Sequence, residues 1–83
     1  MSARILVVDD EDIVIKSCMR ILEDGDYQID SAHDGREALR KVEDSPYDIM
    51  IVDIMMPNIG GLEVLRRVKE AYPNVDVIMI TGL

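Results

Sequence analysis

Short apolar segments alternate with amphipathic segments along the chain. Short, mainly apolar runs rich in branched residues predict buried strands at 4–8, 48–53 and 75–80, because strands covered on both faces need no polar alternation. Residues 27–32 alternate enough for another strand but are more polar. We therefore expect this strand at an edge of the sheet.

Between these strands, apolar residues recur at the spacing of helices. The first predicted helix follows Asp12 and should stop at Gly25; its apolar positions are 14, 15, 18, 19, 21 and 22. Asp34, with Glu37 three residues later, resembles a capping box and predicts Asp34 as the N-cap of the second helix, which Ser45-Pro46 should end.

A third helix is predicted over residues 61–72, with Leu62, Leu65 and Val68 facing inward and Pro73 closing it. The resulting order is βαβαβαβ. Strands that alternate with helices in this way favour a parallel sheet with helices on both faces. We find no internal repeat beyond the βα unit, no linker and no low-complexity segment.

Composition narrows the class of protein. The 83 residues allow one small domain, and the scarcity of aromatic residues predicts an aliphatic core. The net charge of −8 argues against a nucleic-acid or anionic-membrane surface, and permits a cation or a basic partner. Cys18 is the only cysteine, so no intrachain disulfide can form, and we expect it in the core. We see no signal peptide or membrane span and expect a cytoplasmic protein.

Polar side chains stand where predicted strands end. Asp9 and Asp10 follow the first strand, Asp53 ends the third, and Thr81 ends the fourth. Ligands of open α/β sheets bind outside the carboxyl ends of the strands. If the first and third strands are neighbours, three carboxylates share one pocket, and Mg²⁺ would relieve their repulsion. The alternative is that Asp9 or Asp12 caps the first helix.

Four segments together resemble the receiver domain of response regulators, the phosphoacceptor of two-component signalling. They are "ILVVDDE" (5–11), "AHDGREAL" (32–39), "DIMMPNIGGLEVL" (53–65) and "VIMITG" (77–82). Their order and spacing are those of the family. The resemblance implies a flavodoxin-like fold, here with strand order 2-1-3-4.

The resemblance also implies roles for individual residues. Asp53 would accept a phosphoryl group from the phosphohistidine of a sensor histidine kinase or phosphotransfer protein, in a Mg²⁺-dependent reaction. Asp10, Asp9, Asp53 and the backbone carbonyl of Met55 would hold the metal. Thr81 would supply the switch hydroxyl, and the backbone N–H groups of Met55 and Gly82 would bind the phosphoryl group. The domain signals rather than working as an enzyme.

Residues 1–83 fall short of the family pattern, which continues with helix 4, strand 5 and helix 5. The lysine that normally faces the phosphoryl group is carried by that strand, and none of Lys16, Lys41 and Lys69 lies at a predicted strand end. A single helix cannot cover one face of four strands, and the fourth strand becomes an edge. We therefore expect self-association or binding of a complementing fragment.

Two other functions remain open. A receiver fragment acting only as a folding or interaction module would keep the fold without phosphotransfer. A Mg²⁺-dependent phosphatase-like enzyme with an aspartyl nucleophile is less favoured, because such enzymes usually carry a second acid two residues after the nucleophile, where this chain has Met55.

Overall fold

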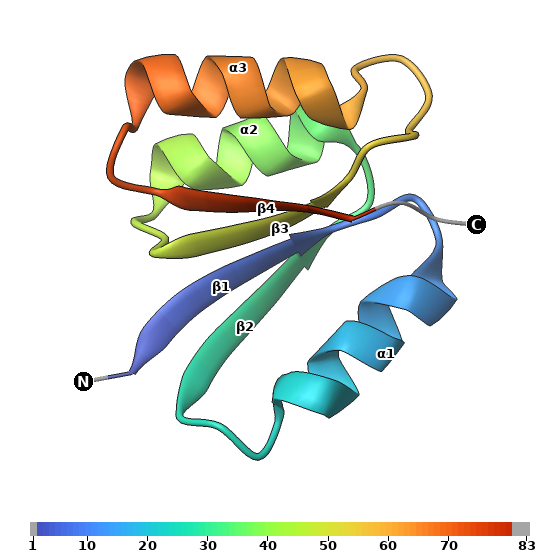
Figure 1. The fold of residues 1–83 in the computed structure, drawn as a ribbon, viewed down its shortest axis with the longest axis vertical. Coiled ribbons are helices and arrows are strands. Elements are labelled where there is room, and N and C mark those ends of the chain that lie inside the picture. The colour runs from blue at the N-terminus through green and yellow to red at the C-terminus, as the bar shows by residue number, and fades with distance from the viewer. Residues whose placement is uncertain (1, 81–83) are drawn as a thin grey trace.

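The fold is known from a computed structural model, which describes residues 2–80. Four strands alternate with three helices (Figure 1). In chain order they are β1 (Ala3–Val8), α1 (Asp12–Leu22), β2 (Tyr27–Ala32), α2 (Gly35–Asp44), β3 (Ile49–Asp53), α3 (Gly61–Ala71) and β4 (Asp76–Ile80). Each predicted strand is present, with its boundaries within one residue of the expected ones.

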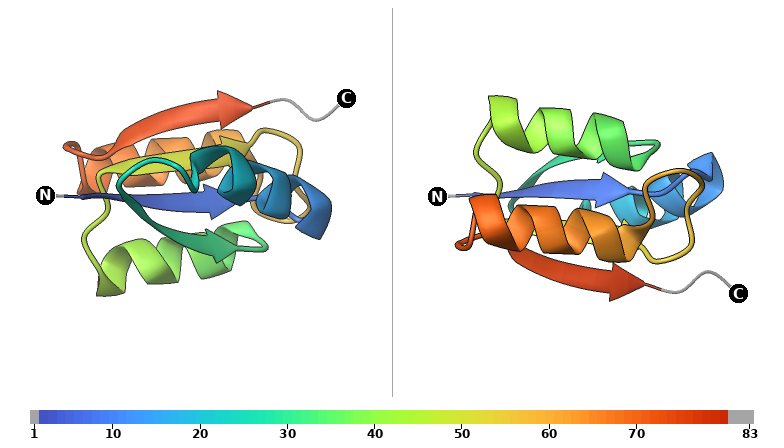
Figure 2. Two further views of the ribbon diagram at one scale, coloured as in Figure 1. Left: turned by 90° about the horizontal axis from the view of Figure 1, so that it is seen from below. Right: turned by 90° about the horizontal axis from the view of Figure 1, so that it is seen from above.

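The four strands form one parallel sheet with the order β2-β1-β3-β4. Helices α2 and α3 lie side by side on one face of this sheet, and α1 lies on the other (Figures 1 and 2). This is the predicted flavodoxin-like arrangement. The more polar strand, β2, is at one edge as expected, and β4 is at the other.

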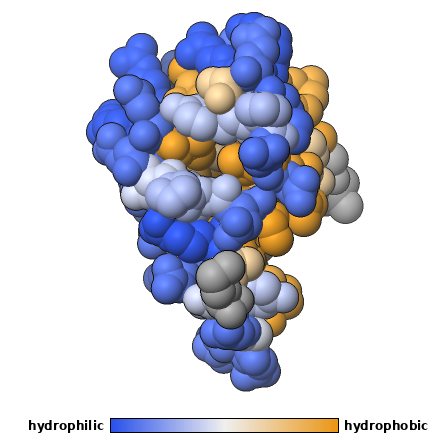
Figure 3. Space-filling model, turned by 90° about the vertical axis from the view of Figure 1, so that its left-hand side faces the viewer, coloured by the Kyte–Doolittle hydropathy of each residue, from blue (hydrophilic) through white to orange (hydrophobic). Residues whose placement is uncertain are grey.

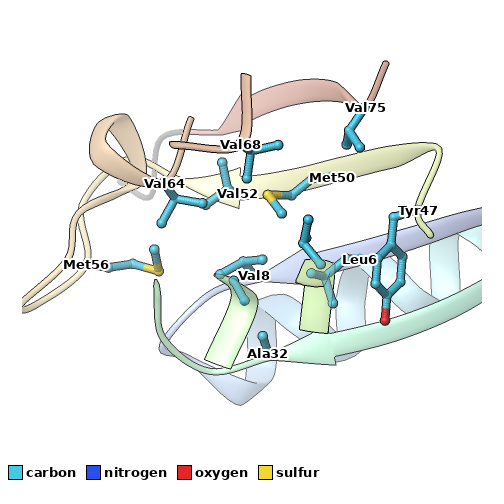
Figure 4. Close-up of a cluster of buried hydrophobic side chains, with 12 residues drawn as sticks. Leu6, Val8, Ala32, Tyr47, Met50, Val52, Met56, Val64, Val68 and Val75 are labelled. Carbon is cyan, nitrogen blue, oxygen red and sulfur yellow. The ribbon is translucent and has the colours of Figure 1, made fainter. Parts of the chain in front are cut away.

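The larger core lies between the sheet and the α2–α3 layer (Figure 4). Its fully buried side chains from the sheet include Leu6, Met50 and Val52, and α3 contributes Val64 and Val68. The core is aliphatic apart from Tyr47, as the scarcity of aromatic residues predicted. A smaller core on the α1 side contains Ile5, Val7 and Ile15, with Cys18 packed against it and only partly buried.

The inward faces of two helices differ from the prediction at single positions. Leu62 is 63% exposed, and Val64 is completely buried in its place. Ile21 is 78% exposed, whereas Ile15 is the buried residue of α1. Both helices carry more apolar residues than one buried stripe needs, so the pattern alone could not fix their rotation.

The predicted cap of α2 is present. The side chain of Asp34 accepts a hydrogen bond from the N–H of Glu37 at 2.8 Å. The return bond of the capping box goes one residue further back, because Glu37 accepts from the N–H of His33, also at 2.8 Å. Helix α1 begins differently: its N-cap is Glu11, without a side-chain cap. Neither Asp9 nor Asp12 caps it.

The α1 side of the sheet is only partly covered. Helix α1 contacts β1 and β2, whereas Ile78 on β4 is 50% exposed and Ile49 and Ile51 on β3 are partly buried. In the view of Figure 3, hydrophilic residues cover most of the surface, and hydrophobic residues gather at the centre and along one side. Within residues 2–80, no helix is long and apolar enough to span a bilayer.

Candidate functional site

Three carboxylates meet at the carboxyl ends of β1 and β3. These strands are neighbours, and Val8 pairs with Val52 in the parallel register. Asp9 and Asp53, the residues that follow this pair, therefore lie at the same level of the sheet. Asp10 joins them, and one oxygen from each of the three side chains lies within 4.8 Å of the others. The sequence-based prediction of converging acids is confirmed.

Two of these acids are buried. Asp9 is 2% exposed and Asp53 is 5% exposed, and they are the buried charged residues of the part of the chain that the structure describes. Asp10 is exposed at the mouth of the site. Burying a carboxylate costs free energy unless hydrogen bonds or a counter-charge stabilise it, so the cluster favours binding of a cation.

Each buried carboxylate is held by a backbone N–H two residues further along the chain. Asp9 Oδ1 accepts from Glu11 at 2.9 Å, and Asp53 Oδ1 accepts from Met55 at 3.1 Å. Within residues 2–80 the Oδ2 atoms of Asp9 and Asp53 have no protein donor. Both side chains therefore keep an oxygen available for a ligand.

Burial and like charges also act on the pKa of Asp9. Burial raises this pKa most, and the negative charges of Asp53, Asp10 and Glu11 raise it further, against the hydrogen bond from Glu11, which lowers it. A positive ion among these groups would remove the repulsion. The donors are hard oxygen atoms, few in number and partly open to water, which is the set that Mg²⁺ prefers. The residues present therefore fit this metal.

The loop between β3 and α3 is fixed at both of its ends. Ile54 N donates to Ile80 O at 3.0 Å and Gly61 N donates to Ile54 O at 3.1 Å. Asn58 adopts a left-handed conformation with φ of 66°, which asparagine tolerates better than most residues. A turn after Asp53 was expected from Pro57 and the glycine pair at 60 and 61, but the left-handed conformation of Asn58 was not.

Gly61 brings α3 directly against the backbone of Asp53. A Cβ atom built there would lie 2.8 Å from the carbonyl carbon of Asp53 and closer still to its oxygen. A Cβ atom built at Gly60 would make only ordinary van der Waals contacts, the nearest at 3.6 Å from the carbonyl oxygen of Ile54. Close packing, rather than a positive φ, therefore explains the glycine at position 61.

The remaining residues of the predicted site are Met55, Thr81 and Gly82. The side chain of Met55 is 73% exposed, whereas Met56 beside it is buried in the core. Thr81 and Gly82 lie outside the described residues, so their roles stay predictions. Ile80, the last residue given for β4, pairs with Asp53 in the parallel register.

The three lysines lie away from the carboxylates. Lys41 donates to the carbonyl of Ser31 at 2.5 Å, and Lys69 donates to the carbonyls of Pro73 and Val75 at 3.0 and 2.8 Å. Lys16 is exposed on α1.

His33 has a partner that the sequence did not indicate. The side chain is exposed, and its Nε2 lies 2.6 Å from Asp12 Oδ1. This hydrogen bond, followed by the attraction of Asp12 and Glu37, raises the pKa of His33. Because Asp12 lies on α1 and Glu37 on α2, the histidine links the two helices at the carboxyl end of the sheet.

Comparisons with known proteins agree on one family. Residues 5–83 match the profile of the Response regulator receiver domain. Response regulator MprA of Mycobacterium ulcerans is 40% identical over 82 residues, which are 99% of this chain and 35% of that protein.

Two solved structures are also similar. The response regulator TrrA of Thermotoga maritima, solved in complex with Mg(2+)-BeF, has a TM-score of 0.93 and 40% identity, over 100% of this chain and 71% of that one. A CheY-like receiver domain protein of Methanospirillum hungatei has a TM-score of 0.94 and 32% identity. The match covers 100% of this chain and 66% of that one.

Proposed function

The chain belongs to the response regulator receiver domain family, and we propose that it is the phosphoacceptor of a two-component system, with Asp53 as the residue phosphorylated. The observation that carries this proposal is the cluster of Asp9, Asp10 and Asp53 at neighbouring strand ends. The chain spans about a third of the length of the curated relative MprA. The proposal therefore concerns the receiver domain and does not extend to the activity of a longer protein.

Asp53 has the features of a nucleophile in this transfer. Its Oδ1 is held by the Met55 N–H, which leaves Oδ2 to attack. In the proposed step, Oδ2 forms a bond to phosphorus while the bond from phosphorus to a nitrogen of the donor phosphohistidine breaks, and the leaving imidazole keeps the electron pair. The product is an aspartyl phosphate. The proposed donor is a sensor histidine kinase or a phosphotransfer protein.

The proposed metal ligands are the side chains of Asp9, Asp10 and Asp53 with the backbone carbonyl of Met55. When bound, Mg²⁺ would neutralise charge on the phosphoryl oxygens during transfer. TrrA was solved with Mg(2+)-BeF, which supports the same chemistry here. Thr81, with the N–H groups of Met55 and Gly82, is proposed to bind the phosphoryl oxygens afterwards.

A receiver fragment that binds partners without phosphotransfer is the second candidate function. The positions of the lysines favour it, because Lys41 and Lys69 donate to backbone carbonyls elsewhere and Lys16 lies on α1. No lysine of this chain therefore contacts the carboxylate cluster within residues 2–80. A phosphatase-like enzyme has less support, since Met55 offers no acid beside Asp53.

Intact-mass measurement separates these functions. The chain is incubated with Mg²⁺ and acetyl phosphate, alongside Asp53→Asn and a control, Asp76→Asn, which removes an exposed acid from the opposite end of the sheet. A receiver gains the mass of one phosphoryl group in the wild type and in Asp76→Asn, and none in Asp53→Asn or with EDTA. A folded chain that gains no mass supports the interaction module, and steady hydrolysis of a phosphate ester supports the phosphatase.

Self-association is a further part of the proposal. The half-exposed Ile78 and the partly buried Ile49 and Ile51 leave apolar surface on the α1 side of the sheet. A second copy of the chain or a complementing fragment would bury that surface. We propose a cytoplasmic location and no direct contact with nucleic acid, which the net charge of −8 supports.

A further inference from the structure

A groove runs along the outside of the α2–α3 layer. Its main hollow, of about 590 Å³, is lined by Arg36, Leu39, Arg40, Glu43, Ile59 and Arg67. A second hollow of about 390 Å³ shares Arg36 and Ile59 with the first and extends it to the loop residues 57–59. The two hollows therefore adjoin at Arg36 and Ile59, on the side of the sheet where α2 and α3 lie side by side (Figure 2).

The main hollow of the groove is basic although the protein is acidic. Three of the nine cationic side chains line it, while the net charge of the chain is −8. Arg36 and Arg40 are exposed one turn apart on α2, and within residues 2–80 no carboxylate lies within ion-pair distance of either. Their charge is therefore available to a partner.

The third arginine is already paired. Arg67 Nε lies 2.8 Å from Glu63, and hydrogen bonds from Arg66 and Arg67 lower the pKa of Glu63 to about 2. Glu43 is the one acid that lines the main hollow, and Asp34 lines the second. The positive character of the main hollow therefore comes from Arg36 and Arg40.

The floor of the groove is apolar. Leu39 and Ile59 are partly buried and pack against the main core, and the side chain of Ile59 also fills the space in front of Gly35. An apolar floor beneath cationic side chains is complementary to an amphipathic helix. Such a helix has large aliphatic residues on one face and carboxylates beside them. A nucleic acid would be attracted to the cationic side chains but would make no favourable contact with the apolar floor.

We propose that the groove between α2 and α3 docks an acidic, amphipathic helix from a protein partner. The partner's apolar side chains lie against Leu39 and Ile59, and its carboxylates lie beside Arg36 and Arg40. The site differs from the carboxylate cluster and does not use the chemistry of Asp53. Since the groove reaches the loop that follows Asp53, a docked helix contacts the segment that positions this residue.

The test is a titration of the ¹⁵N-labelled chain with a synthetic helical peptide of about 15 residues. The peptide carries leucines at i, i+3 and i+7 with glutamates beside them, and a second peptide has lysines in place of the glutamates. Shifts are expected at the lining residues of the groove with the acidic peptide only, and they should weaken as salt is raised.

Matched variants separate the groove from net charge. The double substitution Arg36→Glu/Arg40→Glu should weaken binding about tenfold or more. Lys16→Glu/Arg20→Glu changes the net charge equally on exposed positions of α1 and should leave affinity within about twofold. Asp53→Asn should bind like the wild type, so loss of phosphorylation and loss of docking are separate results.

Several results would overturn the proposal. They are no binding by folded protein, equal loss in both double variants, equal binding of the lysine peptide, and shifts scattered over the surface. Tighter binding of a double-stranded oligonucleotide at the same residues would also overturn it, because the groove would then recognise a polyanion.

Discussion

At the scale of single residues, the site depends on a glycine as much as on its acids. Gly61 lets the first turn of α3 lie against the backbone of Asp53, and its N–H closes the loop by bonding to Ile54. The position of Asp53 and the start of α3 are thus fixed by the same close contact. Gly60 beside it is not constrained in this way.

Substitution of the two glycines should therefore differ. Gly61→Ala is expected to lower the free energy of unfolding by about 1–3 kcal/mol, because the new methyl group overlaps the Asp53 carbonyl. Gly60→Ala should change it by less than about 1 kcal/mol, since a Cβ atom there would make only ordinary van der Waals contacts. Urea denaturation measures both. Equal losses would show that close approach is not what position 61 requires.

Removal of one crowded carboxylate should stabilise the metal-free protein. Asp9 is buried beside Asp53 and Asp10, and burial and repulsion raise its pKa. We expect Asp9→Asn to raise the free energy of unfolding by about 1 kcal/mol without Mg²⁺, and to reduce the extra stability that Mg²⁺ gives the wild type. Thermal melts with and without Mg²⁺, using Asp76→Asn as the control, measure this. Unchanged stabilisation by Mg²⁺ would exclude Asp9 as a ligand.

At the scale of elements, the positions of helices and strands along the chain were predicted better than the rotation of each helix about its axis. Strand ends carry the site, so Asp9, Asp10 and Asp53 could be placed together from the order of the elements. Helix faces could not be fixed, because Leu62 and Val64 are both apolar and only packing against the sheet buries Val64. The hydrogen bond of His33 with Asp12 joins residues 21 positions apart, and no local pattern signals it.

The link that His33 makes between α1 and α2 should depend on pH. Its pKa is raised in the folded protein by the hydrogen bond and attraction of Asp12, with Glu37 also contributing. The resulting stabilisation is complete below the unfolded pKa of about 6.5 and is lost as pH rises through the folded pKa. Because the ring is 54% exposed, we expect only about 0.5 kcal/mol.

Urea denaturation of the wild type and His33→Gln across this pH range measures the effect. The difference between them should shrink with rising pH and should be smaller in the Asp12→Asn background, where only Glu37 still acts on His33. An NMR titration in which the pKa of His33 is not raised would contradict the assignment.

At the scale of the whole molecule, two helices cover one face of the sheet and one helix covers part of the other. The strand order was predicted from the resemblance to the receiver family, and right-handed crossovers then predicted which helices lie on each face. The apolar surface on the α1 side follows from that arrangement. It is the physical basis for expecting a second copy or another segment there.

The sedimentation behaviour of the chain tests this expectation. We predict that the wild type self-associates at micromolar concentration and that Ile78→Lys shifts it to a monomer, because the substitution places a charge on the uncovered face of β4. Ile21→Lys is the control: Ile21 is more exposed, at 78% against 50% for Ile78, but lies on α1. A folded, soluble wild-type monomer at these concentrations would contradict the prediction.

Chemical localisation of the phosphoryl group addresses the function most directly. After treatment with acetyl phosphate and Mg²⁺, borohydride reduces an aspartyl phosphate to homoserine, and tandem mass spectrometry of the digested chain identifies the modified position. We predict homoserine at position 53 alone, and none when Mg²⁺ is chelated. Modification at Asp9 or Asp10 instead, or no modification of a folded chain, would contradict the assignment of Asp53 as the phosphoacceptor.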